Sequence, residues 1–230
     1  MQILYEDNHI IIVNKKPGEI VQGDKTGDRP LSELVKDYIK EKYAKPGNVF
    51  LGVAHRLDRP VGGVVVFART SKALTRLNAM FGSGKVEKTY LAIVANRPQS
   101  ERGEIVSWLT RNERLNKSFS SDKPVANAKE ARLRYALVAS ANNYHLVAVR
   151  LLTGRHHQIR CQLASTGCPI KGDLKYGARR SNADGSISLL AWRVKFVHPV
   201  SQKQIEIFAP CPDTTLWHAL TNNIDHSLTI

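Results

Sequence analysis

The chain has 230 residues, and its 34 lysines and arginines against 20 aspartates and glutamates give a formal net charge of +14 at pH 7. Its hydrophobic content of 42% is enough for a sizeable core and excludes a disordered or collagen-like chain. Apolar runs such as residues 64–68 are far shorter than the roughly 18 residues of a membrane span. The N-terminus lacks the basic start of a secretory signal, and three cysteines fit a reducing compartment. We therefore expect a cytoplasmic location.

The basic excess lies between residues 51 and 180. Within it, residues 150–180 carry seven basic side chains and one acidic side chain, whereas residues 1–50 have no net charge. Such an excess attracts polyanions, because lysine and arginine neutralise phosphates and release counterions. Charge alone favours a nucleic acid as the partner, although many basic proteins bind none.

The first third of the chain predicts a strand hairpin and two helices. Residues 3–5 and 10–13 are short apolar runs on either side of a polar turn, which is typical of a hairpin. Apolar residues with helical spacing predict a helix from about residue 30 to 43, with a proline at its start. A second helix is expected from a threonine or serine cap to a glycine, over residues 70–82.

The rest of the chain is dominated by predicted strands. They are expected at residues 89–95, 104–109, 131–138, 144–152, 189–197 and 204–209. Residues 111–129 show no clear period and predict an exposed basic loop, and residues 178–187 predict another. Because strands dominate and helices interrupt them in clusters, we expect one α+β domain rather than a doubly wound parallel sheet.

The first candidate site lies in residues 55–63, which predict a polar turn leading into a buried strand. Asp58 on this turn is flanked by Arg56 and Arg59, and a neighbouring guanidinium favours the charged form of a carboxylate. A pair of glycines after it allows the backbone to approach a ligand closely. Such a carboxylate suits a nucleophile or a base; the alternative is an aspartate that only caps a turn.

The second candidate site lies in residues 153–167, where a strand ends and a short helix closes at Gly167. Arg155, His156 and the first free N–H groups of that helix would face the same region, which suits a phosphate. The alternative is an ordinary amphipathic helix with a solvated basic face.

Histidines and cysteines around this helix suggest a metal site or a nucleophilic cysteine. The spacing of His156, His157, Cys161 and Cys168 fits no usual zinc pattern, and the neighbouring arginines would repel a cation. Cys161 falls on the side of the helix that we expect to be apolar, so we interpret it as a packed, inert thiol. We expect no metal site.

Four motifs, in this order along the chain, resemble those of the RluA family of RNA pseudouridine synthases. They are His55-Arg56-Leu57-Asp58-Arg59-Pro60-Val61-Gly62-Gly63, Lys88-Thr89-Tyr90-Leu91-Ala92, Thr153-Gly154-Arg155-His156-His157-Gln158-Ile159-Arg160, and Pro169-Ile170-Lys171-Gly172-Asp173 with Tyr176-Gly177. The resemblance covers about residues 1–210. It implies a curved, mostly antiparallel mixed sheet with flanking helices and a central basic cleft. It also implies catalysis without metal or organic cofactor. The N-terminal S4 module that is frequent in the family is not expected here, because residues 1–50 have no net charge and enter the catalytic domain directly. We therefore expect a single catalytic domain over residues 1–230.

The resemblance implies a role for each matched residue. Asp58 matches the essential aspartate and Arg160 the arginine paired with it. Tyr90 matches the tyrosine at the uracil ring, and Arg56 an arginine that enters the RNA stack where the target uridine leaves. The other residues that we expect to bind the substrate are His55, Arg59, Arg155 and His156.

The implied reaction fits these residues chemically. Conversion of uridine to pseudouridine breaks the C1′–N1 bond, rotates the uracil and forms a C1′–C5 bond without net oxidation. One carboxylate can act as nucleophile or base in such an isomerisation, whereas glycoside hydrolysis needs two facing carboxylates. The target base must also leave the stack. We therefore predict an isomerase acting on uridines of structured RNA, either tRNA or rRNA, with no membrane partner and no obligate protein partner.

Two other functions stay open from the sequence. A non-catalytic RNA-binding or assembly protein could use the same scaffold, whereas a DNA-binding protein would need a recognition helix, whose pattern is not found. Departures from the family pattern leave substrate choice open, and they fall at Val61, Gly62, His156, Gln162 and Leu190. Neither the RNA nor the uridine position can be read from the sequence.

Overall fold

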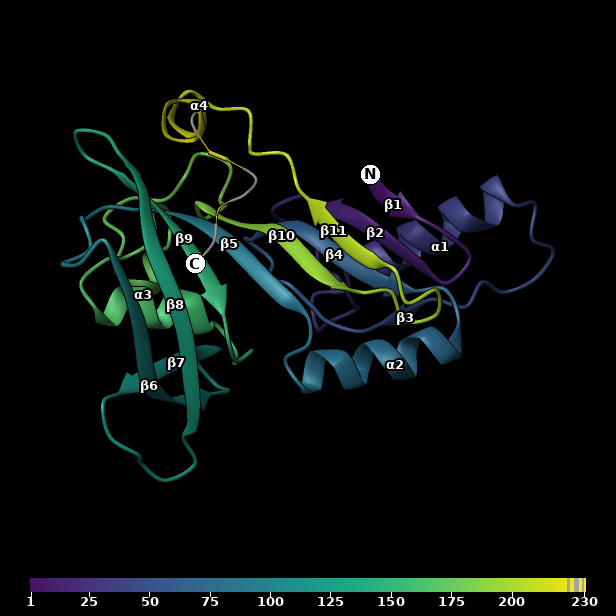
Figure 1. Cartoon of the computed structure of the whole chain (residues 1–230), viewed down its shortest axis with the longest axis horizontal. Coiled ribbons are helices and arrows are strands. Elements are labelled where there is room, and N and C mark those ends of the chain that lie inside the picture. Colours follow the sequence, from purple (N-terminus) through teal and green to yellow (C-terminus); the bar gives the residue numbers. More distant parts are fainter. Residues whose placement is uncertain (223, 226–227, 229) are drawn as a thin grey trace. The chain divides into compact units, whose positions relative to one another are not determined.

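The computed structural model describes residues 1–222, 224–225, 228 and 230 of the chain. They form two compact units (Figure 1). The first unit consists of residues 1–87 and 191–209, and the second of residues 88–190 with the described part of 210–230. The chain thus returns to the first unit after completing most of the second. The interpretation as one catalytic domain stays a prediction.

The first unit combines strands with two helices. Its elements are β1 (Gln2–Glu6), β2 (Ile10–Lys15), α1 (Leu31–Lys42), β3 (Gly52–Val53), β4 (Gly62–Ala68), α2 (Ser71–Gly82), most of β10 (Leu189–Val197) and β11 (Gln204–Phe208). The strands adjoin in the order β1-β2-β4-β10, with β3 beside β4 and β11 beside β10. The β1–β2, β2–β4, β3–β4 and β10–β11 pairs are antiparallel.

The core of the first unit explains why β2 and β4 read as unbroken apolar runs. Residues 10–13 on β2 have no exposed side-chain surface, and all seven residues of β4 are buried. A strand covered on both faces needs no polar alternation. The predicted hairpin and both predicted helices are confirmed. At the start of α2, the Thr70 hydroxyl accepts a hydrogen bond from the Ala73 N–H at 3.2 Å, as expected of an N-cap.

The second unit is an antiparallel sheet with α3 packed against it. Its elements are nearly all of β5 (Glu87–Val94), β6 (Arg102–Asn112), β7 (Lys117–Ser121), β8 (Lys129–Ser140), β9 (His145–Leu151), α3 (Gln158–Ser165), a 3₁₀ helix (Leu174–Tyr176) and α4 (Thr215–Thr221). The strand order is β5-β9-β8-β6-β7. Contacts to β6 and β7 hold α3 (Figure 1). From α3, the buried Gln162 amide donates to the Ser107 hydroxyl and to the Ala131 carbonyl, both at 3.0 Å.

The stretch 111–129 differs from the exposed loop that the sequence predicts, because it contains β7. This strand pairs with the end of β6 although its sequence, Lys-Ser-Phe-Ser-Ser, has no apolar alternation. Its buried residue is Ser118, whose N–H donates to the Tyr176 hydroxyl oxygen at 2.8 Å. A buried polar residue with a hydrogen-bond partner therefore stands where the alternation of a strand would place an apolar residue. The sequence also misses β3 and α4.

The remaining predicted strands form close to their expected bounds, and residues 178–187 contain no helix or strand. Antiparallel strands with a few helices confirm the predicted α+β class. The central basic cleft and the cytoplasmic location stay predictions. No helix in the described part of the chain combines the length and apolar character that crossing a membrane requires.

Candidate functional site

Asp58 lies in the first unit, on the turn between β3 and β4. The Val61 N–H donates to the Asp58 carbonyl oxygen at 3.0 Å and closes the turn. Leu57 beside it is buried, Arg56 is exposed and Asp58 itself is half-buried. The turn leads directly into the buried strand β4, as the sequence predicts.

A buried lysine that is not among the predicted site residues holds this turn from its inner side. Lys15, the last residue of β2, is 1% exposed. The three N–H groups of its Nζ are shared among four main-chain carbonyl oxygens, those of Lys16 (3.1 Å), Asp58 (3.3 Å), Arg59 (3.0 Å) and Val61 (2.7 Å). Burial lowers the pKa of Lys15 to about 8, while the negative charges of Glu19 and Asp58 act in the opposite direction.

The paired glycines after the turn are needed for packing. Gly63 has a φ of +115°, and a Cβ on it would lie 2.3 Å from the carbonyl oxygen of Ala191 on β10. A Cβ on Gly62 would lie 3.1 Å from Cδ of Pro17. The close approach that the sequence suggests for these glycines is thus made to neighbouring protein groups.

Arg59 points its guanidinium at the loop that precedes α1. Its Nη1 lies 2.5 Å from Oδ2 of Asp28, and its Nη2 lies 2.7 Å from Oγ1 of Thr26 and 3.3 Å from Oδ2 of Asp24. The sequence predicts that a neighbouring guanidinium, of Arg56 or Arg59, favours the charged form of Asp58. The contacts of the Arg59 guanidinium instead belong to residues 22–29, so its own charge is largely neutralised there.

His55 packs inside the first unit. Its Nε2 accepts a hydrogen bond from the Val66 N–H at 2.9 Å, and its ring stacks on Phe81 with centroids 4.5 Å apart. Through these contacts His55 connects the turn to β4 and α2 and so stabilises the first unit. A contact of His55 with RNA stays a prediction.

Tyr90 lies on β5 of the second unit, opposite Val149 of β9, and is 9% exposed. Lys88, two residues earlier, shares its face of the strand. Burial lowers the pKa of Lys88. The motif around Tyr90 therefore places an aromatic ring and a lysine on the same side of β5.

Arg160 lies in the first turn of α3 and is 5% exposed. It forms a bidentate ion pair with the buried Asp173, with Nε 2.7 Å from Oδ2 and Nη2 2.9 Å from Oδ1. The Tyr176 ring centroid lies 5.1 Å from its Cζ. A buried guanidinium needs such partners. The family resemblance implies Asp58 as the partner of Arg160, whereas the partner seen here, Asp173, stands in the fourth motif without a predicted role. The pairing with Asp58 stays a prediction.

Tyr176 joins α3 to β7. Its hydroxyl oxygen accepts from the Ser118 N–H and lies 2.9 Å from Nδ1 of His157. Burial and the charge of Arg160 lower the pKa of His157 to about 2, so its ring is neutral and Nδ1 can accept the hydroxyl proton. Burial raises the pKa of Tyr176 to about 12. This network therefore supports Arg160 and exchanges no proton near neutral pH.

His156 contacts the hairpin of β6 and β7, whereas Arg155 contacts β8. The His156 ring has Nδ1 3.0 Å from Oγ of Ser118 and Nε2 3.1 Å from Oδ1 of Asn116. Arg155 is exposed, and its Nε donates to the Glu130 carbonyl at 2.9 Å. The predicted contacts of both residues with phosphate stay predictions.

Cys161 has the properties of an inert thiol. It is buried, its Sγ donates to the Ser118 carbonyl at 3.3 Å, and burial raises its pKa to about 11. A thiol with this pKa carries no thiolate near neutral pH. Among the residues that the structure describes, no three His, Cys, Asp or Glu side chains are arranged to hold a metal ion.

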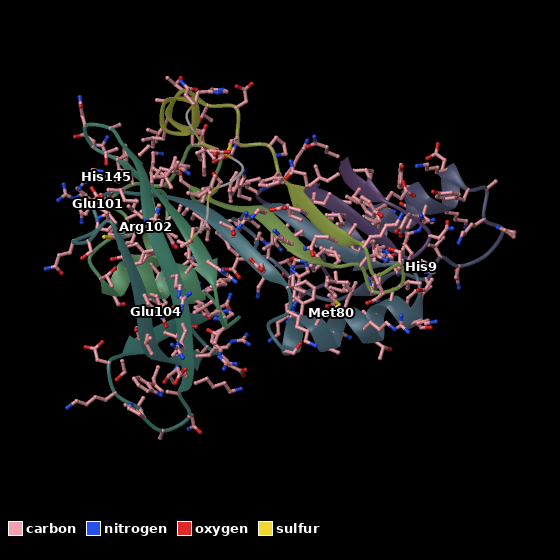
Figure 2. All side chains as sticks on the ribbon, viewed as in Figure 1. His9, Met80, Glu101, Arg102, Glu104 and His145 are labelled. Carbon is pink, nitrogen blue, oxygen red and sulfur yellow. The ribbon has the colours of Figure 1, made fainter. Side chains whose placement is uncertain are left out.

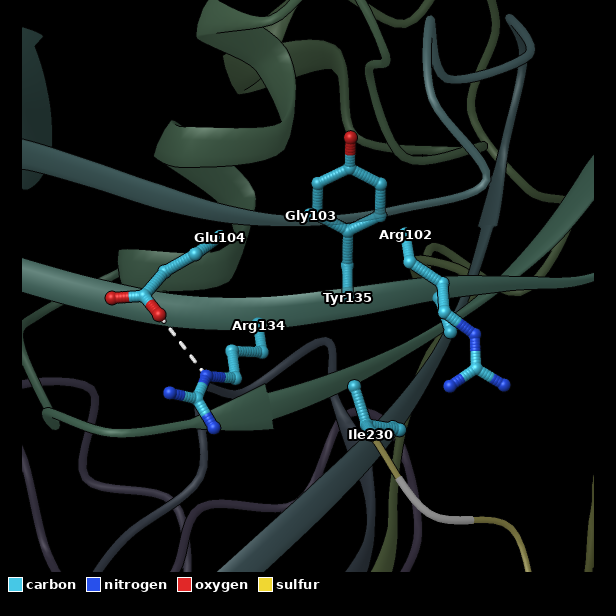
Figure 3. A pocket seen from close by; sticks show the side chains of 7 residues that line it. Arg102, Gly103, Glu104, Arg134, Tyr135 and Ile230 are labelled. Atoms are coloured by element: carbon cyan, nitrogen blue, oxygen red, sulfur yellow. Dashed lines mark hydrogen bonds and ion pairs between the residues drawn. The ribbon is translucent and has the colours of Figure 1, made fainter.

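A cavity of about 210 Å³ lies on the second unit, and none of the predicted site residues lines it (Figure 3). Arg102 and Glu104, which line it, project from β6 (Figure 2). Nε of Arg134 lies 3.0 Å from Oε2 of Glu104. The Tyr135 ring packs on Gly103, where a Cβ would lie 2.9 Å from the ring. We assign this cavity no part in the chemistry.

Comparison with known proteins gives the same answer as the motifs. The model of the RNA pseudouridylate synthase family matches residues 9–165. Over 225 residues the chain is 33% identical to the ribosomal large subunit pseudouridine synthase C of Vibrio cholerae, covering 95% of this chain and 68% of that protein. The chain belongs to the RNA pseudouridylate synthase family. The predicted RluA-family membership and the predicted class of enzyme, an isomerase acting on RNA uridines, are thereby confirmed.

Other relatives of this synthase agree. It is 29% identical over 222 residues to the ribosomal large subunit pseudouridine synthase D of Zymomonas mobilis, covering 92% of this chain and 69% of that protein. The synthase spans about two thirds of the length of these curated relatives. The solved structure of human RNA Pseudouridylate Synthase Domain Containing 4 has a TM-score of 0.77 at 21% identity, covering 92% of this chain and 89% of that one, which supports the predicted fold.

Proposed function

We propose that this synthase converts uridine to pseudouridine in ribosomal RNA of the large subunit, with Asp58 as the catalytic carboxylate. The observation that carries the assignment of Asp58 is its hydrogen bonding to Lys15. The buried ammonium binds the carbonyl oxygens of Asp58, Arg59 and Val61 and so holds the main chain that follows the half-buried carboxylate. The relatives named for the ribosomal large subunit support rRNA over tRNA as the substrate.

In the proposed mechanism, Asp58 acts either as a nucleophile at C1′ or C6 or as a base at the sugar. The C1′–N1 bond breaks, the uracil turns, and C1′ bonds to C5. The proton on C5 is lost and N1 gains one, so atoms and charge balance. Tyr90 stacks on the ring and assists removal of the C5 proton.

Arg160 supplies positive charge beside Asp58 in this proposal, as the family resemblance implies. Two of its nitrogens, Nε and Nη2, are held by Asp173. That arrangement orients the guanidinium, and in this proposal Nη1 contacts the Asp58 carboxylate. A guanidinium beside a carboxylate keeps it charged, which both roles of Asp58 require.

RNA binding in this proposal uses the basic residues around the two motifs. Arg56 and Arg155 are exposed and suit it best. Arg56 enters the space that the target nucleotide leaves when it is flipped, and Arg155 with His156 binds the backbone. His55 supports the turn from within the first unit.

The test is a map of pseudouridines in RNA from cells with and without the protein. We expect at least one pseudouridine of large-subunit rRNA to be lost, and to be restored by the wild type but not by Asp58→Asn. Loss confined to tRNA would contradict the proposed substrate. Restoration by Asp58→Asn would contradict the role of Asp58. A normal cellular role for that variant would favour a non-catalytic RNA-binding protein.

A further inference from the structure

Two aspartates of the exposed loop 22–29 are linked by the residue between them. The Thr26 hydroxyl lies 2.5 Å from Oδ1 of Asp24 and 3.0 Å from Oδ2 of Asp28. The Thr26 N–H also donates to Oδ1 of Asp24 at 2.9 Å. The loop therefore holds its two carboxylates in place through its own side chain and main chain.

The guanidinium of Arg59, which lies more than 30 residues later in the chain, contacts all three of these side chains. Its nitrogens contact both carboxylates and the hydroxyl, at 2.5 to 3.3 Å. Hydrogen bonding from Arg59 lowers the pKa of Asp28, and hydrogen bonding from Thr26 lowers that of Asp24, so both are charged at neutral pH. The N–H donors of Arg59 that could bind a phosphate are thus occupied by two carboxylates.

The main chain of Arg59 is fixed as well. Its carbonyl oxygen accepts from Nζ of Lys15 at 3.0 Å and from the Gly18 N–H at 2.8 Å. Hydrogen bonds therefore hold Arg59 at both ends. Its carbonyl is bound by the buried Lys15, and its guanidinium by the exposed loop. Because one peptide bond joins it to Asp58, a change in its position moves Asp58 too.

We propose that Arg59 is a positioning residue, and that the clasp formed by Asp24, Thr26 and Asp28 around it fixes the Asp58 turn in its productive geometry. The inference rests on the proposed catalytic role of Asp58. It replaces the expectation that Arg59 binds RNA. Small errors in the placement of a catalytic group lower the rate of the chemical step, which gives the clasp its importance.

A clasp and a phosphate contact predict different kinetic losses. Removal of a phosphate contact weakens RNA binding and reduces its salt dependence. Removal of the clasp lowers the rate at saturating RNA and leaves the Kd in place. Single-turnover rates and Kd values, measured on a large-subunit rRNA transcript that the wild type modifies, separate the two.

The first experiment compares Arg59→Met with Arg29→Met. Arg29 is a matched control, because it is an exposed arginine at the end of the same loop and pairs with Asp37 outside the clasp. We expect Arg59→Met to lower the rate about fivefold with the Kd changed less than about twofold, as fits the loss of exposed ion pairs. Asp28→Asn should act in the same direction, and Arg29→Met should match the wild type. An unchanged rate with weakened binding in Arg59→Met would overturn the proposal.

The second experiment exchanges the charges. Arg59→Asp alone should be slower than Arg59→Met, and the double variant Arg59→Asp with Asp28→Arg should recover most of the rate because the ion pair is restored in reverse. A phosphate contact could not be recovered in this way, so absence of rescue in a variant that unfolds cooperatively contradicts the clasp. If Asp58→Asn is fully active, the role of Asp58 fails. If Asp58→Asn is inactive and Arg59→Met has the wild-type rate, only the clasp fails.

Discussion

The ammonium of Lys15 donates a 2.7 Å hydrogen bond to the carbonyl oxygen of Val61, from a side chain that is 1% exposed. The same group reaches the carbonyls of Asp58 and Arg59. Buried charges are tolerated only where polar partners compensate for lost hydration, and here the partners are backbone dipoles of one turn. The end of β2 is therefore part of the support of the candidate catalytic residue.

Replacement of Lys15 by methionine should destabilise the protein and lower its activity. The change removes the hydrogen bonds of Nζ to these carbonyl oxygens, including the 2.7 Å bond to Val61, while those of Asp58 and Arg59 keep one main-chain donor each. We expect a cost of about 2 kcal/mol in the free energy of unfolding. Urea denaturation measures it, and Lys16→Met is the matched control because that neighbouring lysine is exposed. Equal stability of the two variants would contradict the assigned role.

The lowered pKa of Lys15, about 8, predicts opposite effects of pH on stability and on rate. Between pH 8 and the ordinary value of 10.5, the unfolded chain binds the proton that the folded chain has lost. Stability from this group therefore rises with pH in that window. The neutral amine has one N–H fewer for the turn, so the single-turnover rate should fall with a midpoint near pH 8. A flat rate profile up to pH 9.5 would contradict this.

Replacement of Asp173 by asparagine should be strongly destabilising. It removes the bidentate carboxylate that pairs with the buried guanidinium of Arg160, which costs about 3–5 kcal/mol. The matched control is Asp213→Asn, which breaks an exposed pair with His218 and should change stability by less than about 1 kcal/mol. Thermal and urea unfolding of both variants provide the comparison, and a small loss for Asp173→Asn would show that the pair is dispensable.

Two glycines with positive φ should respond differently to alanine. In Gly63→Ala the new Cβ meets the main chain of Ala191 at 2.3 Å, whereas in Gly18→Ala nothing lies within 4 Å. We expect Gly18→Ala to cost only the backbone strain, about 1 kcal/mol. Gly63→Ala should cost several times more or prevent folding, because backbone atoms must shift. Similar melting temperatures would argue against this packing.

The sequence predicts most elements and the position of Asp58 because these depend on local patterns. Apolar runs mark the strands, and the polar turn before β4 marks Asp58. Prediction from the sequence fails where a polar residue is buried and its hydrogen-bond partners are distant in sequence. Ser118 on β7 is satisfied by Tyr176, and Lys15 by a turn more than 40 residues later.

The charged partners of the motif residues are also distant in sequence and are therefore not predicted. The sequence predicts that Arg59 acts on its neighbour Asp58, whereas its guanidinium binds Asp24 and Asp28 in the loop before α1. Arg160 likewise has Asp173 as a bidentate partner. Adjacency along the chain does not determine which charges meet, because side chains of neighbouring residues on a turn point in different directions. Only the spatial arrangement identifies these partners.

The most direct test of the account is release of tritium from RNA labelled at C5 of uridine. Formation of the C1′–C5 bond expels the C5 hydrogen into water, so release reports the isomerisation itself. The wild type and Asp122→Asn, which changes an exposed carboxylate, should release tritium at equal rates from large-subunit rRNA. Asp58→Asn should bind the same RNA and release none. Release by Asp58→Asn at the wild-type rate would contradict the central claim that Asp58 is the catalytic carboxylate.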